Sequence, residues 1–214
     1  ETTVTDITVD SSGDDGSQFI RETDGLAELL LTAGSGNVSL ETTAAGNVLS
    51  TDTAVDISGT TVSVTIADGD YGDTDTAAGN AIETTAGALS VDTSANNNNQ
   101  FVRETDGLSE IALLAGTGNV TALTVGTGDV LSADAAVDIT ATTLDFTVTD
   151  GDFGDTDTAA GNAIETTVTD ITVDSSGDDG SQFIRETDGL AAVDLNAGTG
   201  NVTAATVNTG DVLD

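Results

Sequence analysis

The stretch Thr60–Asp68 reads TTVSVTIAD, and its apolar side chains recur at every second position. Val62, Val64 and Ile66 alternate with Thr and Ser, which is the two-residue period of a β-strand with one buried face. Eighty-two residues later, Thr142–Asp150 reads TTLDFTVTD, where the inner positions change size but stay apolar and the outer positions change freely. Both stretches indicate strands that bury one face and expose the other.

The whole chain repeats with this period and without gaps. The copies cover residues 1–82, residues 83–164 and, in part, residues 165–214; residues 1–27 are identical to residues 165–191. A shorter repeat of ten residues lies inside each copy, as in GSGNVSLETT followed by AAGNVLSTDT. Such self-similarity is typical of solenoids, propellers and arrays of domains.

The segments between the apolar stretches carry Gly, Asn and Asp, and the chain contains no Pro. A stacked ladder that uses every backbone N–H has reason to exclude proline. We therefore expect an all-β protein folded as a parallel β-helix, or β-solenoid, with about four coils per repeat and one continuous rod. An array of β-sandwich domains is the alternative, because seven short strands fit each repeat.

The chain has 38 acidic residues, three Arg, no Lys and no His, for a formal net charge of -35. This charge excludes electrostatic binding to nucleic acid or to an anionic membrane surface, and it favours cations as partners. The absence of Cys excludes disulfides and thiolate chemistry. Because the chain starts in mid-pattern and open strand edges invite pairing, we expect an excerpt of a longer array, or copies that stack end to end.

The motif RETDG occurs three times and holds the only basic residues, Arg21, Arg103 and Arg185. In so acidic a chain, we expect each arginine to form a structural salt bridge with a carboxylate of its own or an adjacent coil. A catalytic or ligand-binding arginine is the alternative, but His, Lys and Cys are absent as partners.

The densest acidic segment is DGDYGDTDT, which recurs as DGDFGDTDT. Several carboxylates within eight residues can surround a hard cation such as Ca²⁺, so the sequence offers one candidate metal site per full copy. Its residues are Asp68, Asp70, Asp73, Asp75, Asp150, Asp152, Asp155 and Asp157. The spacing is not that of an EF-hand, and a solvated acidic loop at a coil corner is the alternative. Apart from Ca²⁺, no cofactor is expected.

A second polar loop, SSGDDGSQ, becomes TSANNNNQ in the middle copy. The exchange of Asp14 and Asp15 for Asn96 and Asn97 keeps oxygen atoms but removes two charges. A charge-dependent site would not tolerate that exchange, so we interpret this loop as a turn.

Three segments, GNAIETTVTDITVDSS, QFIRETDGLAELLLTAGSGNVSLETT and DGDYGDTDTAAGNAIETT, resemble the repeat regions of giant bacterial exoproteins of the filamentous haemagglutinin type. The resemblance covers the whole chain and is one of pattern. It implies a right-handed parallel β-helix as a shaft, secretion to the cell surface or the extracellular space, and a role in adhesion or scaffolding.

These observations predict a structural protein and not an enzyme. The acidic residues recur with the 82-residue repeat, whereas an enzyme needs an active site that differs from the repeated pattern. The expected function is the shaft of an extracellular fibre, filament or giant surface adhesin. The alternatives are an adhesin module that binds a glycan or protein, an ice-binding Thr face and a polysaccharide-active enzyme. The adhesin module depends on exposed aromatic side chains, for which Tyr71 and Phe153 are the candidates.

Overall fold

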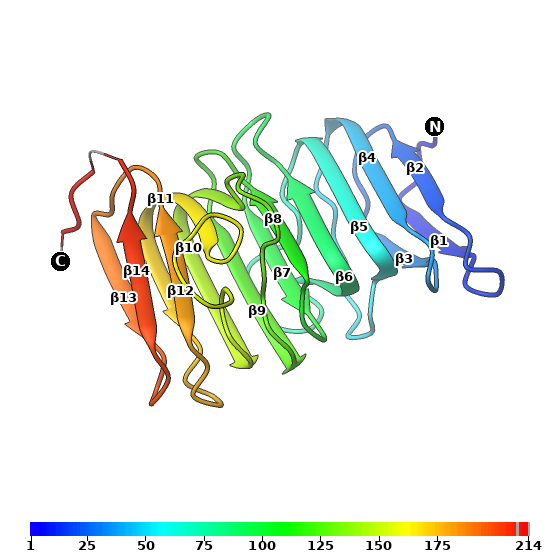
Figure 1. The fold of residues 1–214 in the computed structure, drawn as a ribbon. Coiled ribbons are helices and arrows are strands. Elements are labelled where there is room, and N and C mark those ends of the chain that lie inside the picture. The colour runs from blue at the N-terminus through cyan, green and yellow to red at the C-terminus, as the bar shows by residue number, and fades with distance from the viewer. Residues whose placement is uncertain (209, 214) are drawn as a thin grey trace.

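The computed structural model describes residues 1–208 and 210–213 as an all-β protein. Within this part of the chain no helix is long and apolar enough to span a membrane. The strands stack side by side, and the two ends of the chain lie at opposite ends of the stack (Figure 1). They are β1 (Asp6–Asp10), β2 (Gln18–Glu22), β3 (Glu28–Thr32), β4 (Val38–Ala45), β5 (Ile57–Asp68), β6 (Ile82–Asp92), β7 (Gln100–Glu104), β8 (Glu110–Leu114), β9 (Val120–Thr127), β10 (Ile139–Asp150), β11 (Ile164–Asp174), β12 (Gln182–Glu186), β13 (Ala192–Asn196) and β14 (Val202–Thr206).

Every strand pair is parallel, and each coil contributes one segment to each of two faces. Face A consists of β1, β3, residues 57–59 of β5, residues 82–86 of β6, β7, β9, residues 143–150 of β10, residues 170–174 of β11, and β13. Face B consists of β2, β4, residues 61–68 of β5, residues 88–92 of β6, β8, residues 139–141 of β10, residues 164–168 of β11, β12 and β14. The described residues therefore form a parallel β-solenoid of nine coils, which confirms the predicted fold.

The core lies between the two faces and is built from the apolar positions of the alternating pattern. Val62, Val64 and Ile66 are at most 1% exposed. In the ladder Val62 pairs with Val38, and Val64 pairs with Leu40, so each inward side chain stacks on its neighbour in the adjacent coil. Burying each such side chain contributes about 1.5–3 kcal/mol, so the stacked apolar positions stabilise the rod coil by coil.

The long strand β5 passes from face A to face B without interruption. Its alternation slips at the corner, because Thr60 and Thr61 are both exposed between the buried residues Gly59 and Val62. A Cβ atom added at Gly59 would lie 2.9 Å from the carbonyl oxygen of Gly36 in the preceding coil. The corner therefore needs glycine for close approach of two backbones.

The coils differ in length, which changes the number of coils per repeat. Paired residues of adjacent coils are 20 positions apart at Gln18 and Val38, and 27 positions apart at Val62 and Leu89. On face A, β1 belongs to the first coil. Its counterpart two repeats later is residues 170–174 of β11, which belong to the eighth coil. Two repeats thus span seven coils, so each repeat has three and a half coils in place of the expected four.

A half-integral number of coils places equivalent residues of successive copies on opposite faces. β1 lies on face A, whereas its counterpart, residues 88–92 of β6, lies on face B. Coils of successive copies also pair with each other, as β5 pairs with β6 and β10 with β11. One ladder thus runs through successive copies.

Candidate functional site

The acidic loop of residues 69–81 connects face B to face A after β5, and two of its aspartates have backbone amides as partners. Asp75 Oδ1 accepts from the Ala77 N–H at 2.8 Å and from Asn80 Nδ2 at 3.0 Å. The hydrogen bonds from Asn80 and Ala77 lower the pKa of Asp75. Asp70 Oδ1 accepts from the Asn99 N–H at 2.7 Å, which ties the loop to the following turn. These carboxylates stabilise turns and contacts between coils.

Among the described residues, no three of the eight aspartates of the predicted metal sites bring a carboxylate oxygen within 4.8 Å of one another. In the second copy Asp152 and Asp157 repeat the turn contacts, accepting from the Ser181 N–H at 2.6 Å and the Ala159 N–H at 2.8 Å. The exposed members of the set are Asp68, Asp73, Asp75, Asp155 and Asp157. Ca²⁺ binding by this loop therefore stays a prediction of the sequence.

The aromatic side chains of the acidic loops do not form a binding surface. Tyr71 and Phe153 are 0% exposed, which corrects the expectation that they project outward. Each pairs in a bridge with the neighbouring coils, Tyr71 with Val48 and Gln100. An aromatic residue that follows the end of a strand here fills the coil corner.

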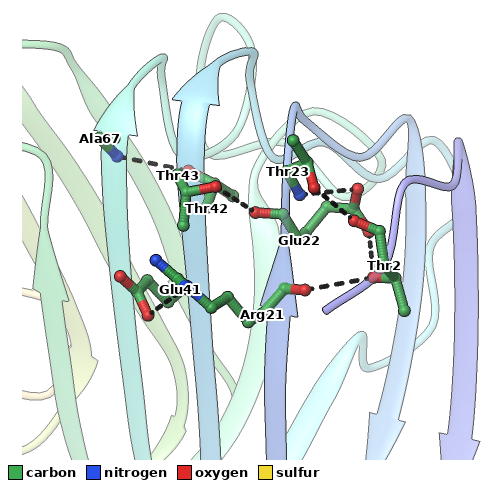
Figure 2. A network of polar contacts seen from close by, with 8 residues as sticks. All are labelled: Thr2, Arg21, Glu22, Thr23, Glu41, Thr42, Thr43 and Ala67. Atoms are coloured by element: carbon green, nitrogen blue, oxygen red, sulfur yellow. Dashed lines mark hydrogen bonds and ion pairs between the residues drawn. The ribbon is translucent and has the colours of Figure 1, made fainter.

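The three arginines lie on the outer surface of their strands, but their partners differ. Arg21 Nε lies 3.2 Å from Glu41 Oε2 of the adjacent coil, with both side chains about half exposed at 53% and 51% (Figure 2). Arg103 and Arg185 instead donate from Nη1 to backbone carbonyl oxygens of the acidic loops, at Thr76 (2.9 Å) and Thr158 (3.0 Å).

The neighbour in the following coil accounts for this difference between the arginines. In that coil the residue paired with Arg21 is Glu41, whereas Arg103 pairs with Leu123 and Arg185 with Ala205. Of the arginines in the described part of the chain, Arg21 alone has a carboxylate within 4.0 Å. The predicted salt bridge is thus present at Arg21, and the other two arginines attach an acidic loop to the rod.

The glutamate of RETDG is the buried residue of the motif. Glu22, Glu104 and Glu186 are at most 1% exposed. Glu104 Oε2 accepts from Thr84 Oγ1 at 2.6 Å, while Oε1 accepts from the Thr105 N–H at 3.0 Å. Glu22 makes the equivalent contacts with Thr2 and with the Thr23 N–H (Figure 2). The side chain therefore joins its own turn to the preceding coil.

Burial raises the pKa of this glutamate in two of the copies, whereas at Glu22 the hydrogen bonds from Thr2 and Thr23 outweigh burial and lower the pKa. Burial is the main cause that raises the pKa of Glu104 to about 8, and the nearby Asp106 adds to it. Burial and Asp188 likewise raise the pKa of Glu186 to about 7. Both side chains consequently hold a proton over part of the neutral range.

A group of three carboxylates, which we call the carboxylate cluster, lies on the outer side of face A. Glu28, Asp52 and Asp56 each place one carboxylate oxygen within 4.8 Å of the others. Asp56 is 1% exposed, Glu28 is half-buried and Asp52 is exposed. At this separation two carboxylates repel each other by about 0.9 kcal/mol even in water, and by more where water is excluded.

A second carboxylate cluster occurs one repeat later, on the outer side of face B. It consists of Glu110, Asp134 and Asp138, again with one oxygen from each within 4.8 Å of the others. The two clusters share the sequence pattern Ser-x-Asp-x-Ala-Val-Asp, at residues 50–56 and 132–138. The duplication shows that the arrangement belongs to the repeat.

Ser50 lies between two carboxylates of the first cluster. Its Oγ is 2.6 Å from Asp56 Oδ1 and 2.9 Å from Glu28 Oε1. The Thr51 hydroxyl donates to Glu28 Oε2 at 2.7 Å. Burial favours the neutral form of Glu28, but the hydrogen bonds from Thr51 and Ser50 outweigh it and lower the pKa of this side chain.

Glu83 adds a fourth carboxylate at the buried side of the first cluster. It is 2% exposed, and its N–H donates to Asp56 Oδ2 at 2.7 Å. Glu83 Oε1 accepts from the Gly79 N–H at 3.0 Å, but Oε2 has no hydrogen-bond partner among residues 1–208 and 210–213. Burial, together with the adjacent Glu83 carboxyl group, raises the pKa of Asp56 to about 8.

The second copy reproduces this contact with Glu165. Its N–H donates to Asp138 Oδ2 at 2.7 Å, and its Oε2 also has no partner within the described chain. Burial and the neighbouring Glu165 raise the pKa of Asp138 to about 8. The sequence did not single out these residues, because acids 27 positions apart give no local signal, although the repeated Ser-x-Asp-x-Ala-Val-Asp pattern was visible.

No family model matches the chain, and neither a curated protein nor a solved structure matches it.

Proposed function

We propose that this chain is part of the structural shaft of an extracellular fibre, filament or surface adhesin. The observation that carries the proposal is that one parallel ladder runs from β1 to β14 through successive copies, with β5 paired to β6 and β10 paired to β11. A repeat whose coils pair with those of its neighbours extends the same rod when it is added again, so tandem duplication lengthens the solenoid without adding a hinge.

The distribution of side chains supports a structural role. Inward positions form one aliphatic core, and most of the 38 acidic residues lie outside it, where they keep a long rod soluble. The resemblance to exoprotein repeats supports an extracellular location. Cations that offset the acidic surface, and further copies of the chain at the strand edges, are the partners that this role implies.

An adhesin module that binds a glycan on the solenoid face has weaker support. Such a face would use exposed aromatic side chains, whereas Tyr71 and Phe153 are fully buried. Phe19 is 82% exposed, but its counterparts Phe101 and Phe183 are half-buried beside the acidic loops. The exposed aromatic thus does not recur with the repeat.

Electron microscopy of the native material tests the proposal. Thin sections and negatively stained surface preparations would be labelled with an antibody raised against this chain. We expect the label to follow filaments, with an axial period of about 17 Å per repeat or about 34 Å for two. Label on compact particles without a filament would contradict a shaft.

A further inference from the structure

We propose that each carboxylate cluster, completed at its buried side by the unpaired glutamate, binds one Ca²⁺ ion. The first site comprises Glu28, Asp52, Asp56 and Glu83, and the second comprises Glu110, Asp134, Asp138 and Glu165. These residues differ from the loop aspartates that the sequence suggested. The inference is independent of the shaft proposal, because it concerns the isolated chain.

The donor atoms suit a hard cation. Each cluster presents three carboxylates within 4.8 Å, and a serine hydroxyl lies against it, at 2.6 Å from Asp56 in the first copy and 2.9 Å from Asp138 in the second. Ca²⁺ takes six to eight oxygen ligands in variable geometry, whereas Mg²⁺ requires a near-ideal octahedron and retains water. An irregular set of oxygen atoms from a strand and a loop favours Ca²⁺.

The unpaired glutamate oxygen is an independent indication of a missing positive charge. Glu83 Oε2 and Glu165 Oε2 are buried against Asp56 and Asp138, and no N–H or hydroxyl group of the described residues donates to either oxygen, so the neighbouring carboxyl group is their remaining polar contact. A buried carboxylate oxygen without a partner is costly. Arg103, whose backbone is paired with that of Glu83 in the ladder, directs its Nη1 to the Thr76 carbonyl oxygen instead.

The contacts of Ser50 lead to the same conclusion. A hydroxyl group has one proton to donate, yet its oxygen lies within 2.9 Å of carboxylate oxygens of both Glu28 and Asp56. One of these contacts therefore needs a further positive charge, from a proton or from a metal ion. Asp52 is exposed at the outer rim, which leaves a route from solvent for an ion.

Binding is best measured on the intact chain after removal of metal with EDTA. Equilibrium dialysis against ⁴⁵Ca²⁺ in about 0.15 M NaCl, which screens the general acidic surface, should give two saturable sites per chain. Asp52→Asn should reduce the Ca²⁺ affinity of the first site at least about tenfold and leave the second site unchanged. Asp52→Asn combined with Asp134→Asn should reduce the affinity of both sites by at least the same factor. Both substituted residues are exposed, so the variants should keep the melting temperature of the parent chain in EDTA.

The matched control is Asp73→Asn with Asp155→Asn, which removes the same two charges from exposed loop positions. This variant should retain both sites. Absence of saturable binding to the parent chain would show that protons alone occupy the clusters and would overturn the proposal. Loss of binding in the control, with both ions retained by the cluster variants, would overturn it in favour of the acidic loop.

Tyr71 provides a second readout, because it is the only tyrosine and the charges of Asp56 and Glu83 act on its hydroxyl group. Tb³⁺ in place of Ca²⁺ should show tyrosine-sensitised emission from the first site. Asp52→Asn should abolish this emission and Asp134→Asn should leave it unchanged. Equal emission from all variants would contradict the assignment of the first site.

Discussion

Two residues of RETDG have different roles, and the acidic one has the larger structural effect. Arg21, Arg103 and Arg185 lie at the surface and have three different ladder partners. The glutamates at positions 22, 104 and 186 are buried and join each turn to the preceding coil. A surface ion pair such as Arg21 with Glu41 contributes about 0–1 kcal/mol, whereas a buried carboxylate that loses its partners costs more.

The raised pKa values of Glu104 and Glu186 predict that stability falls as pH rises. In the folded chain these values are about 8 and about 7, above the ordinary value of 4.5. Because the folded state holds these protons more tightly, their stabilising contribution is complete below about pH 4.5 and is lost as pH rises through about 8. Each proton adds a slope of at most about 1.4 kcal/mol per pH unit.

This prediction is checked by urea unfolding between pH 5 and pH 9 in EDTA. Glu104→Gln combined with Glu186→Gln mimics the protonated side chains, so the double variant should show a flatter profile than the parent and a smaller loss of stability at pH 9. Asp106, Asp188 and Tyr71 face these groups and remain in both proteins. Parallel profiles for the two proteins would show that the glutamates do not titrate as proposed.

At the scale of the element, the polar turns after β1, β6 and β11 show why Asp and Asn exchange there. Asp15, Asn97 and Asp179 have φ angles of 52°, 60° and 58°, in the left-handed region. In each copy the side-chain oxygen accepts a backbone N–H of the next coil, at 2.8, 2.9 and 2.7 Å. The position requires an oxygen atom and tolerance of positive φ, which both residue types supply.

Substitutions at Asn97 separate these two requirements. Asn97→Asp should leave the urea midpoint nearly unchanged. Asn97→Gly keeps the backbone conformation but loses the bond to the Thr117 N–H, so it should cost about 1 kcal/mol. Asn97→Ala adds about 1–2 kcal/mol of left-handed strain and should be the least stable of the three. Equal stability of the Ala and Asn proteins would contradict this account of the turn.

The sequence predicted the strands and turns but not the phase of the coils. The alternation in Thr60–Asp68 was sufficient to place Val62, Val64 and Ile66 in the core. The corner before it was not predicted, although Thr60 and Thr61 interrupt the alternation that leads from Ile57 to Val62. Without knowledge of how coils of unequal length pair, however, that interruption does not tell how many corners a repeat contains.

The carboxylate clusters were harder to predict for the same reason. Asp56 meets Glu83 because one of the longer coils separates them, and Glu28 joins them from another strand. The dense local run of aspartates in the acidic loop gave a stronger sequence signal. Its side chains nevertheless point to separate partners, since consecutive loop positions need not converge.

For the whole molecule, the central claim is a continuous solenoid in which each repeat advances by three and a half coils. Equivalent turns of successive copies then lie at opposite edges of the rod, and return to the same edge after two copies. If a repeat had four coils, every copy would present its turns at one edge. The two arrangements differ in how the distance between equivalent residues grows along the chain.

Spin-label distances measured by electron paramagnetic resonance test this claim directly. Because the chain has no cysteine of its own, spin labels can be attached to cysteines introduced in pairs at the exposed positions Asp14, Asn96 and Asp178. The three pairs give three distances. Seven coils separate positions 14 and 178, about 34 Å along the axis. Because position 96 lies at the other edge, we predict that the distances 14 to 96 and 96 to 178 both clearly exceed half of the distance 14 to 178. If each is half of that distance, all three turns lie on one edge and the three-and-a-half-coil repeat is wrong.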